Sequence, residues 1–496
     1  MPASNAILTV TEMYRADALT IAGGTPGDAL MEAAGAAVVQ AIVKRWRPRE
    51  VAILCGPGNN GGDGFVIARL LEGLGWPVRV GLAGERAALK GDAAIMAHRW
   101  TEQGDGKVQP LSASVLDGAG LVVDALFGAG LSRPLDGAYR MIIEDLATRV
   151  VPIVAVDVPS GVSGDTGTVL GAAVHATLTV TFFRKKPAHL LLPGRVLCGE
   201  VVVADIGIAD DVLDAITPTI YENGPALWRG DYPWPRLDGH KFDRGHAVVF
   251  GGARMTGAAR LAARAARRVG AGLVSIACDP GAFPIYAAGD PGTIVSPLDT
   301  PDGFKELMAD EHRNAVLVGP GAGTGDDTRR HILAALGAGK ATVVDADGLT
   351  AFADRSGDLY GVLTQRCLLT PHAGEFKRLF GIVGDKLTQA RSAAARAGAV
   401  VLVKGADTVV AAPDGQAVIN ANAPPDLATA GAGDVLAGLA VGLMAQGMPA
   451  FEAACAAVWL HGESAAIAGP GLIAEDLAEA LPTVLRHLRD ASPVPP

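Results

Sequence analysis

The chain has 496 residues, more than one hydrophobic core usually supports, so we expect about two to three domains. Lys and Arg total 42 against 52 acidic residues, a net charge of −10 without a basic run, which argues against a nucleic-acid-binding protein. A phosphorylated ligand would have to be held by backbone N–H groups and single Lys or Arg side chains. No stretch approaches about 18 uninterrupted apolar residues, so we expect no membrane span.

The cysteines favour a reducing compartment. An odd, scattered set indicates free thiols and neither a zinc site nor a disulfide framework. The N-terminal residues carry no basic region and no apolar core of signal-peptide length. We therefore expect a cytoplasmic protein with five free thiols: Cys55, Cys198, Cys278, Cys367 and Cys455.

Short apolar runs alternate with helical patterns in the first half of the chain. Several runs lack polar alternation, which is typical of strands buried on both faces. The predicted strands are residues 51–55, 78–80, 121–124, 153–157, 176–183 and 201–203. The predicted helices are residues 28–46, 63–75, 91–103 and 136–149. This alternation predicts a Rossmann-like three-layer α/β/α domain with a parallel sheet.

Polar groups follow three of these strands. A Gly-rich turn containing Asn59 and Asn60 follows the first strand, and Asn tolerates left-handed backbone there. Asp124 and Asp157 end two later strands. A strand-end Asp taken singly is often a turn-capping residue. Together these oxygens predict a cation site, and their few formal charges favour a monovalent ion over Ca²⁺.

Residues 219–238 are rich in Pro, Gly and aromatic residues and follow neither period. We interpret them as a linker or docking segment, with the domain boundary near residues 216–226. The predicted domains are residues 1–218 and 239–496.

The second half repeats the alternation and predicts a second α/β/α domain. Its expected strands are residues 247–250, 273–277, 315–318, 341–345, 367–370, 399–404 and 408–411. Turns 319–323, 370–375 and 404–408 each follow a strand, and ligands of open parallel sheets bind beyond such strand ends. We therefore expect these turns to converge.

The Ala-Gly-Ala-Gly-Asp run at 430–434 precedes an apolar helix predicted over residues 435–444. Gly431 and Gly433 would let backbone N–H groups at the helix N-terminus hold a phosphate. Asp434 would accept a proton from an attacking hydroxyl, and Glu375 would contact Mg²⁺ through water. Asp434 alone could simply cap the helix. The combination of turns favours phosphoryl transfer.

Gly-x-Gly-Asp before a helix, with an upstream Lys-Gly-x-x-Thr turn, resembles ribokinase-like enzymes. The runs Gly251 to Ala259, Thr370 to Glu375 and Asn420 to Asp434 more closely resemble the ADP-dependent NAD(P)HX dehydratases, which repair hydrated nicotinamide cofactors. This resemblance extends from about residue 237 to the C-terminus. One departure is Ala432, where Ser or Thr is common, which removes a hydroxyl from the phosphate site. The resemblance implies adenine-nucleotide contacts at Lys404, Gly405, Ala406, Asp407, Thr408, Gly431 and Gly433, and substrate contacts at Ala258, Gly321, His372 and Asp434.

Residues from about 9 to 210 resemble the NAD(P)HX epimerases, a family also similar to apolipoprotein A-I-binding protein. The resemblance implies three K⁺ ligands: Asn60, Asp124 and Ser160. It places around the substrate Asn59, Asn60, Gly61, Gly62, Asp63, Gly128, Ala129, Gly130, Leu131, Ser132, Arg133, Pro134, Tyr139 and Asp157.

The two resemblances together predict a bifunctional repair enzyme. The N-terminal domain would interconvert R- and S-NAD(P)HX with Asp157 as the acid/base, and Lys186 is a weaker second candidate. The C-terminal domain would use Asp434, ADP and Mg²⁺ to phosphorylate and expel the hydroxyl of S-NAD(P)HX. NADHX or NADPHX and ADP are the expected partners, in a homo-oligomer without nucleic acid or membrane.

Two alternatives stay open at this stage. The C-terminal half could be a ribokinase-like small-molecule kinase fused to a non-catalytic ligand-binding domain. The N-terminal half could be a binding module or scaffold. The sequence does not decide whether ADP or ATP is the preferred nucleotide, or whether NADHX or NADPHX is the preferred substrate.

Overall fold

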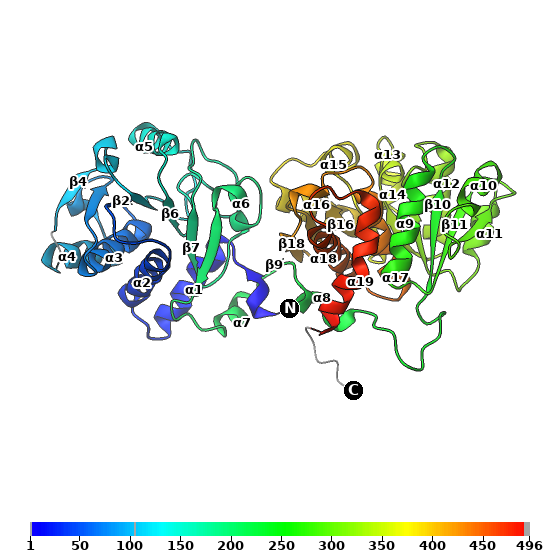
Figure 1. Cartoon of the computed structure of the whole chain (residues 1–496), viewed down its shortest axis with the longest axis horizontal. Helices are drawn as coiled ribbons and strands as arrows, with labels where there is room; N and C mark the ends of the chain where they lie inside the picture. The colour runs from blue at the N-terminus through cyan, green and yellow to red at the C-terminus, as the bar shows by residue number, and fades with distance from the viewer. Residues whose placement is uncertain (1, 104–105, 491–496) are drawn as a thin grey trace. The chain divides into compact units, whose positions relative to one another are not determined.

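The computed structural model describes residues 2–103 and 106–490. These residues form two compact units (Figure 1). The N-terminal unit comprises residues 6–219, and the C-terminal unit starts at residue 220 and takes in residues 2–5. Both units are α/β folds built on parallel strands, as the sequence predicts.

The N-terminal unit contains a sheet in the order β4-β3-β2-β5-β6-β7-β8, and every pairing in it is parallel. Its central strands are buried along their whole length and apolar except for Asp124 of β5, which reflects cover on both faces. The strands are β2 (Val51–Cys55), β3 (Val78–Leu82), β4 (Val108–Pro110), β5 (Leu121–Ala125), β6 (Ile153–Val156), β7 (Leu178–Phe182) and β8 (Glu200–Ala204).

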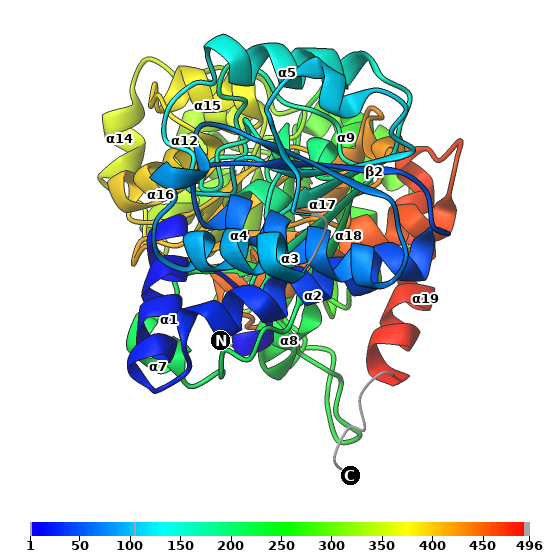
Figure 2. The same ribbon diagram turned by 90° about the vertical axis from the view of Figure 1, so that its left-hand side faces the viewer.

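Helices cover both faces of this sheet. Figure 2 shows β2 between α5 (Gly137–Thr148) on one side and α2 (Gly27–Arg45), α3 (Asn59–Gly73) and α4 (Gly91–Gln103) on the other. Alternate residues of β2 serve the two layers: Leu54 joins the core that contains Ile143 of α5, whereas Cys55 faces Gly64 of α3. The unit also contains α1 (Val10–Ala22), α6 (Gly194–Leu197) and α7 (Val212–Ile216).

Helix α3 begins at Asn59, four residues before the helix start predicted at Asp63. Asn59 and Asn60 therefore occupy the first helical turn, and neither uses the left-handed backbone that Asn tolerates, because neither residue has a positive φ. Glycine is needed here for close packing. A Cβ at Gly61 would lie 1.9 Å from the Gly56 carbonyl oxygen, and one at Gly62 would lie 2.5 Å from Met31 Sδ.

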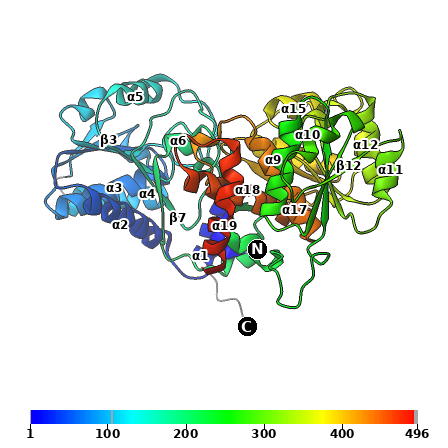
Figure 3. The ribbon, with the colours of Figure 1, turned by 45° about the vertical axis from the view of Figure 1, so that its right-hand side comes forward.

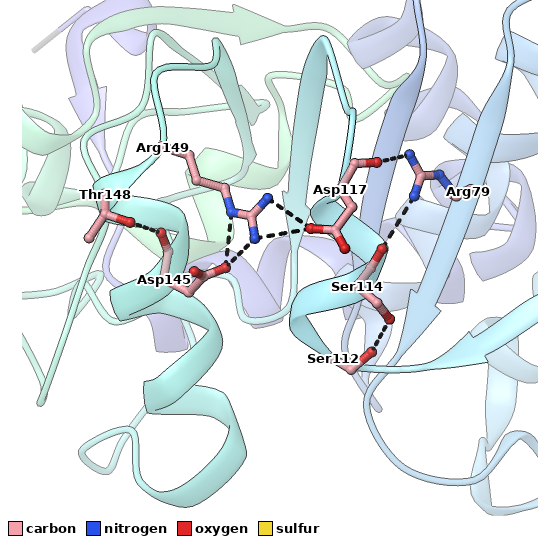
Figure 4. Close-up of polar contacts among 7 residues, drawn as sticks. All are labelled: Arg79, Ser112, Ser114, Asp117, Asp145, Thr148 and Arg149. Atoms are coloured by element: carbon pink, nitrogen blue, oxygen red, sulfur yellow. Dashed lines mark hydrogen bonds and ion pairs between the residues drawn. The ribbon is translucent and has the colours of Figure 1, made fainter.

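Two arginines tie the segment before β5 to its surroundings (Figure 4). Arg149, which caps the C-terminal end of α5, donates to Asp117 Oδ1 over 3.4 Å and to Asp145 Oδ2 over 3.0 Å. Arg79 of β3 donates to the Asp117 carbonyl and, over 3.3 Å, to that of Ser114. These contacts lie away from the polar strand ends and stabilise the fold.

The C-terminal unit contains a longer sheet, which runs β9-β18-β17-β16-β15-β14-β13-β10-β11-β12. Pairings are parallel from β16 to β12, and β17 is antiparallel to both neighbours. The strands are β9 (Ile220–Glu222), β10 (His246–Gly251), β11 (Leu273–Cys278), β12 (Ile294–Pro297), β13 (Ala315–Val318), β14 (Ala341–Val344), β15 (Cys367–Leu369), β16 (Val400–Val403), β17 (Val409–Ala411) and β18 (Ala417–Ile419).

Helices α9 (Thr256–Arg268) and α17 (Ala432–Ala445) pack against each other and on β10. Figure 3 shows α11 (Gly303–Met308) and α12 (Asp326–Gly337) across the sheet from them. Gly438 and Gly442 of α17 allow the close approach, because a Cβ at either would lie within 2.8 Å of the α9 backbone. The remaining helices are α8 (Pro225–Trp228), α10 (Phe283–Ala287), α13 (Asp347–Thr350), α14 (Ser356–Tyr360), α15 (Ala373–Leu379), α16 (Lys386–Ala397), α18 (Ala450–Ala468) and α19 (Ala474–Asp490).

The segment 219–238, interpreted above as a linker, is partly built into the C-terminal unit. Strand β9 pairs in parallel with β18, and Trp228 is fully buried. Asn223 Nδ2 donates to Asn420 Oδ1 and to the Cys455 carbonyl, both over 2.8 Å. Residues 220–228 therefore pack into the C-terminal unit, as a docking segment would.

No helix in residues 2–103 and 106–490 combines the length and apolar character that crossing a bilayer requires. The five cysteines are buried free thiols.

Candidate active sites

The N-terminal unit has a topological switch point between β2 and β5. The chain runs from β2 outward to β3 and β4, then returns to β5 and continues the other way to β8. The loops after β2 and β5 therefore diverge and leave a crevice at their carboxyl ends. These loops carry Asn59, Asn60 and residues 128–134.

A cavity of about 480 Å³ lies at this switch point. Many of the predicted substrate contacts line it: Asn59, Asn60, Asp63, Gly128, Ala129, Gly130, Leu131, Ser132, Arg133 and Asp157. Gly61, Gly62, Pro134 and Tyr139 lie outside its lining. Tyr139 packs edge-on against Phe127, with ring centroids 5.1 Å apart, so it supports the wall from behind.

The three predicted K⁺ ligands gather beside this cavity. Asp124 is fully buried, and its carboxylate accepts from Ser160 Oγ over 2.6 Å and from Ser160 N over 2.8 Å. Ser160 Oγ also accepts from Phe127 N over 2.9 Å. A Cβ at the adjacent Gly128 would lie 3.0 Å from both Asn60 Oδ1 and Asp157 Oδ2, so Asn60 contacts the same loop. Asn60 Nδ2 is buried and has no hydrogen-bond partner among the described residues.

These residues fit a monovalent cation. Burial raises the pKa of Asp124, whereas the hydrogen bonds from Ser160 oppose that shift. Asp124 forms no ion pair with any residue in the described part of the chain. A buried carboxylate beside amide and hydroxyl oxygens offers hard ligands and a single formal charge.

Asp157 is held by several groups. Lys186 Nζ lies 2.9 Å from Asp157 Oδ1, Thr181 Oγ1 donates to the same oxygen over 2.9 Å, and Ala129 N donates to Oδ2 over 2.8 Å. Burial alone would raise the pKa of Asp157, but Lys186 and the Ala129 hydrogen bond outweigh it and lower the pKa to about 2. Its φ of 69° is left-handed, a strained geometry common at functional sites.

His189 supports Asp157 from its backbone side. His189 Nδ1 accepts from Lys186 N over 2.8 Å, so Nε2 carries the proton and donates to the Asp157 carbonyl over 2.9 Å. Burial lowers the pKa of His189 to about 4, which keeps the ring neutral.

Helix α1 contributes two cavity residues that the sequence analysis did not include. Asp17 and Tyr14 both line the cavity. Burial raises the pKa of Asp17 to about 6, the charge of Lys186 opposes the shift and that of Asp157 adds to it. No strand-end or Gly-rich signal marks α1, because it reaches the site by tertiary packing alone.

The C-terminal unit repeats the switch-point arrangement between β10 and β13. The chain runs from β10 to β11 and β12 on one side, then crosses to β13 and continues to β16 on the other. A Cβ at Gly252 would lie 1.7 Å from the Gly321 carbonyl oxygen, so the loops after the two strands touch. Of the turns expected to converge, this contact involves residues 319–323.

Lys404, after β16, extends past the end of β15 to the end of β14. Its Nζ lies 2.6 Å from Asp345 Oδ1 and 4.0 Å from Glu375 Oε2. The pKa of Lys404 is raised: burial would lower it, but Asp345 and then Glu375 outweigh that effect. The sequence predicts Asp345 only as the last residue of a strand and gives it no role in the site. Its position directly before Ala346-Asp347 after a buried strand is the signal that could have identified it.

Asp434 lies in the first turn of α17. The residue that precedes this helix, Gly431, has a φ of 87°. Burial raises the pKa of Asp434 to about 6, Asp345 adds to the shift and Lys404 opposes it. A Cβ at Gly433 would lie 3.7 Å from Lys404 Nζ. Lys404 and Asp434 therefore share one site, where the N-terminal N–H groups of α17 favour an anion.

His372 and Glu375 form a capping box at the start of α15. His372 Nδ1 accepts from Gly374 N over 2.9 Å, and Glu375 Oε2 accepts from His372 N over 2.9 Å. This box leaves His372 Nε2, 3.3 Å from Glu375 Oε1, on a half-exposed ring. Glu375 itself is buried beside Lys404.

Residues 404–408, the turn predicted to bind the nucleotide, are held by hydrogen bonds within the turn. Thr408 Oγ1 donates to the Gly405 carbonyl over 2.7 Å and accepts from Gly405 N over 3.1 Å. Asp407 forms an ion pair with Lys386 of α16. Ala258 lies buried in the first turns of α9, after the loop that touches Gly321.

Lys404 has several acidic groups near it in this C-terminal site. Asp345, Glu375 and Asp434 all act electrostatically on its ammonium. No group of three or more His, Cys, Asp or Glu side chains in the described ranges has the geometry of a metal cage. Mg²⁺ is commonly bound by one or two carboxylates together with substrate phosphates, so this donor set fits it.

Two family models match the chain. One, described as YjeF-related protein N-terminus, matches residues 27–188, and one described as NAD(P)H-hydrate dehydratase matches residues 247–483.

Relatives align over almost the whole chain. A bifunctional NAD(P)H-hydrate repair enzyme from Thermofilum pendens is 37% identical, over 94% of this chain and 93% of the relative. One of the same name from Salinibacter ruber is 38% identical over 96% of each chain. A ribokinase-like superfamily protein from Enterococcus faecalis matches in structure with a TM-score of 0.50 and 23% identity, over 54% of this chain and 96% of its own, which shows a shared fold.

Proposed function

We propose, from the premise that this chain belongs to the bifunctional NAD(P)H-hydrate repair enzymes, that its two switch-point sites act on one damaged coenzyme. The N-terminal unit epimerises R- and S-NAD(P)HX, and the C-terminal unit dehydrates S-NAD(P)HX with ADP. One observation carries the proposal: relatives with this name align across both units. A kinase fused to a non-catalytic domain is not favoured. The relatives named as bifunctional enzymes align with the N-terminal unit as well, and a non-catalytic domain there would not account for a second activity.

In the C-terminal unit, we assign the role of proton acceptor to Asp434. The hydroxyl on the hydrated ring is a poor leaving group, whereas its phosphate ester departs with help from the ring nitrogen. Asp434 would take the hydroxyl proton as the terminal phosphoryl group of ADP reaches the oxygen. A pKa of about 6 suits this role, because the carboxylate is ionised near neutral pH and still basic.

The neighbouring groups would position the nucleotide. The N–H groups at the start of α17, including those of Gly431 and Gly433, would hold phosphate oxygens, and Lys404 would add a positive charge beside them. Ala432 contributes no hydroxyl, so the backbone donors supply this contact. Residues 404–408 would hold the adenosine part, and Ala258, Gly321 and His372 would face the hydrated ring.

Mg²⁺ would neutralise charge on the transferring phosphoryl group when bound. Glu375 would reach it through water, which is consistent with its buried carboxylate beside Lys404. We propose ADP as the phosphoryl donor on the basis of the family resemblance.

In the N-terminal unit, the loops after β2 and β5 would hold the substrate. Asn59, Asn60, Asp63 and residues 128–133 line the cavity and would contact it. We place K⁺ at Asn60, Asp124 and Ser160, where it would compensate the buried carboxylate. Asp157, the acid/base predicted from the sequence, lines the same cavity and would meet the hydroxylated ring there.

One experiment tests both activities. The full chain is incubated with mixed NADHX epimers, ADP, Mg²⁺ and K⁺ while the absorbance of reduced cofactor is followed. We expect complete conversion of both epimers to NADH, because the R epimer passes through the S epimer. Conversion of only the S epimer would contradict the epimerase, and a stable phosphorylated product would contradict the dehydratase.

We further propose a cytoplasmic homo-oligomer. The buried, unpaired thiols support a reducing compartment. Sedimentation of the purified chain tests the oligomeric state, and a monomer at micromolar concentration would contradict it.

A further inference from the structure

The groups around Asp157 make it a poor proton acceptor. Both carboxylate oxygens already accept hydrogen bonds, and Lys186 lies 2.9 Å from one of them. Lys186 is 2% exposed, so this ion pair is shielded from solvent. A carboxylate whose pKa is about 2 binds a proton weakly near neutral pH. This arrangement suits a fixed charge that orients a ligand.

Asp17 offers what Asp157 lacks. It lies on α1, is partly buried and lines the same cavity as Asp157 and the two glycine-bearing loops. Its carboxylate makes no hydrogen bond or ion pair with any residue in the described part of the chain. Both oxygens are therefore available to a molecule in the cavity.

We propose that Asp17 is the catalytic residue that moves the proton during epimerisation, and that Asp157 with Lys186 positions the substrate. This inference rests on the proposed epimerase function. It names a residue on α1, outside the strand-end loops that the sequence analysis assigned to the site.

The proton transfers balance with this one group. Asp17 takes the proton of the hydroxyl on carbon 6, the bond between carbon 6 and the ring nitrogen breaks, and its electron pair goes to nitrogen. The protonated Asp17 returns the proton to that nitrogen, which leaves an open-chain aldehyde. Rotation of the aldehyde and reversal of the same steps close the ring on the other face. No oxidant, reductant or further reactant is consumed.

The titratable groups that interact electrostatically with Asp17 are less suited. Burial raises the pKa of Tyr14, so its phenol stays protonated and does not act as a base. Burial also raises the pKa of Asp63, which is almost inaccessible. Lys186 is paired with Asp157. Among Tyr14, Asp63, Asp157 and Lys186, none combines free oxygens with access to the cavity.

The inference predicts a pH dependence with a definite sign. Asp17 must be ionised to accept the proton, and its pKa is raised to about 6 by burial. The value of kcat/KM for epimerisation should therefore fall as the pH drops below about 6 and level off above it. If Asp157 were the base, this fall would lie near pH 2, far outside the range of a neutral assay.

The test uses Asp17→Asn, Asp17→Glu and Asp28→Asn in the full chain. Asp28 is a matched control, since it is a partly buried helix carboxylate outside the cavity lining, paired with Arg99 over 2.6 Å. Epimer ratios are followed by NMR over a pH series, with NADP⁺ binding as a probe of the folded cavity. We expect Asp17→Asn to lose about 10²- to 10⁴-fold in kcat/KM and its acid limb while still binding NADP⁺.

Asp17→Glu should retain part of the activity and an acid limb, which a merely structural role would not produce. Asp28→Asn should match the wild type. Near wild-type epimerisation by Asp17→Asn would overturn the inference and leave the proposed function intact. If Asp17→Asn does not fold, a wild-type profile without a limb near pH 6 overturns it instead. Absence of interconversion by the wild type would overturn the epimerase function itself.

Discussion

Lys186 Nζ lies 2.9 Å from Asp157 Oδ1, and the pair forms one wall of the N-terminal cavity. Both side chains are largely buried, with exposed fractions of 2% and 17%. Removing one partner of such a pair leaves a charge without compensation in a poorly solvated place. The same pair fixes Asp157 as a permanent anion.

Lys186→Met should therefore destabilise the chain more than an ordinary surface change. We expect a loss of about 3–5 kcal/mol in the free energy of unfolding, measured by urea denaturation. Arg140→Met is the matched control, because Arg140 pairs with Glu144 at a half-exposed helix position. That change should cost less than about 1 kcal/mol. Equal effects of the two substitutions would show that burial of the Lys186 pair has no energetic consequence.

Asp434→Asn should abolish dehydration while nucleotide binding persists. The substitution removes the proton acceptor but keeps the start of α17 and Lys404, which would hold the phosphates. We expect kcat for the ADP-driven step to fall by about 10²- to 10⁴-fold with a nearly unchanged dissociation constant for ADP, measured calorimetrically. Epimerisation in the same variant is the internal control. Turnover close to that of the wild type would reject the role of Asp434.

The dehydratase should lose activity as the pH falls through about 6. Burial and then repulsion by Asp345 raise the pKa of Asp434 to that value, and its protonated form cannot accept the hydroxyl proton. Asp345→Asn removes the repulsion and releases Lys404, and both effects lower the pKa of Asp434. The acid limb of kcat/KM should therefore move to lower pH in this variant. A limb that stays in place or moves upward would contradict the electrostatic coupling.

Ser160→Ala should weaken activation of the epimerase by K⁺. It removes one proposed oxygen ligand and the 2.6 Å hydrogen bond to Asp124. We expect the KCl concentration for half-maximal epimerisation to rise at constant ionic strength. Ser112→Ala, at an exposed serine of the network in Figure 4, should leave the activation curve unchanged. Identical curves for Ser160→Ala and wild type would remove Ser160 from the K⁺ site.

The sequence predicted the α/β class, the family and the function correctly, because these depend on local signals. Continuous apolar runs such as residues 51–55 mark strands buried on both faces, and the Gly-rich turns that follow them mark parallel strand ends. The sequence left residues 219–238 open between a linker and a docking segment, because aromatic and Gly-rich composition does not reveal whether a segment pairs with a distant strand such as β18. The roles assigned to individual site residues stay predictions.

Tertiary structure alone decided which groups meet. Asp17 reaches the cavity from a helix more than a hundred residues away from Asp157, and no sequence period relates them. The pKa values of Asp17, Asp157 and Asp434 depend on burial and on charges brought from other elements, so composition could not order them. Apolar periodicity thus determined the sheets and their polar strand ends, whereas desolvation and neighbouring charge set the pKa of each carboxylate.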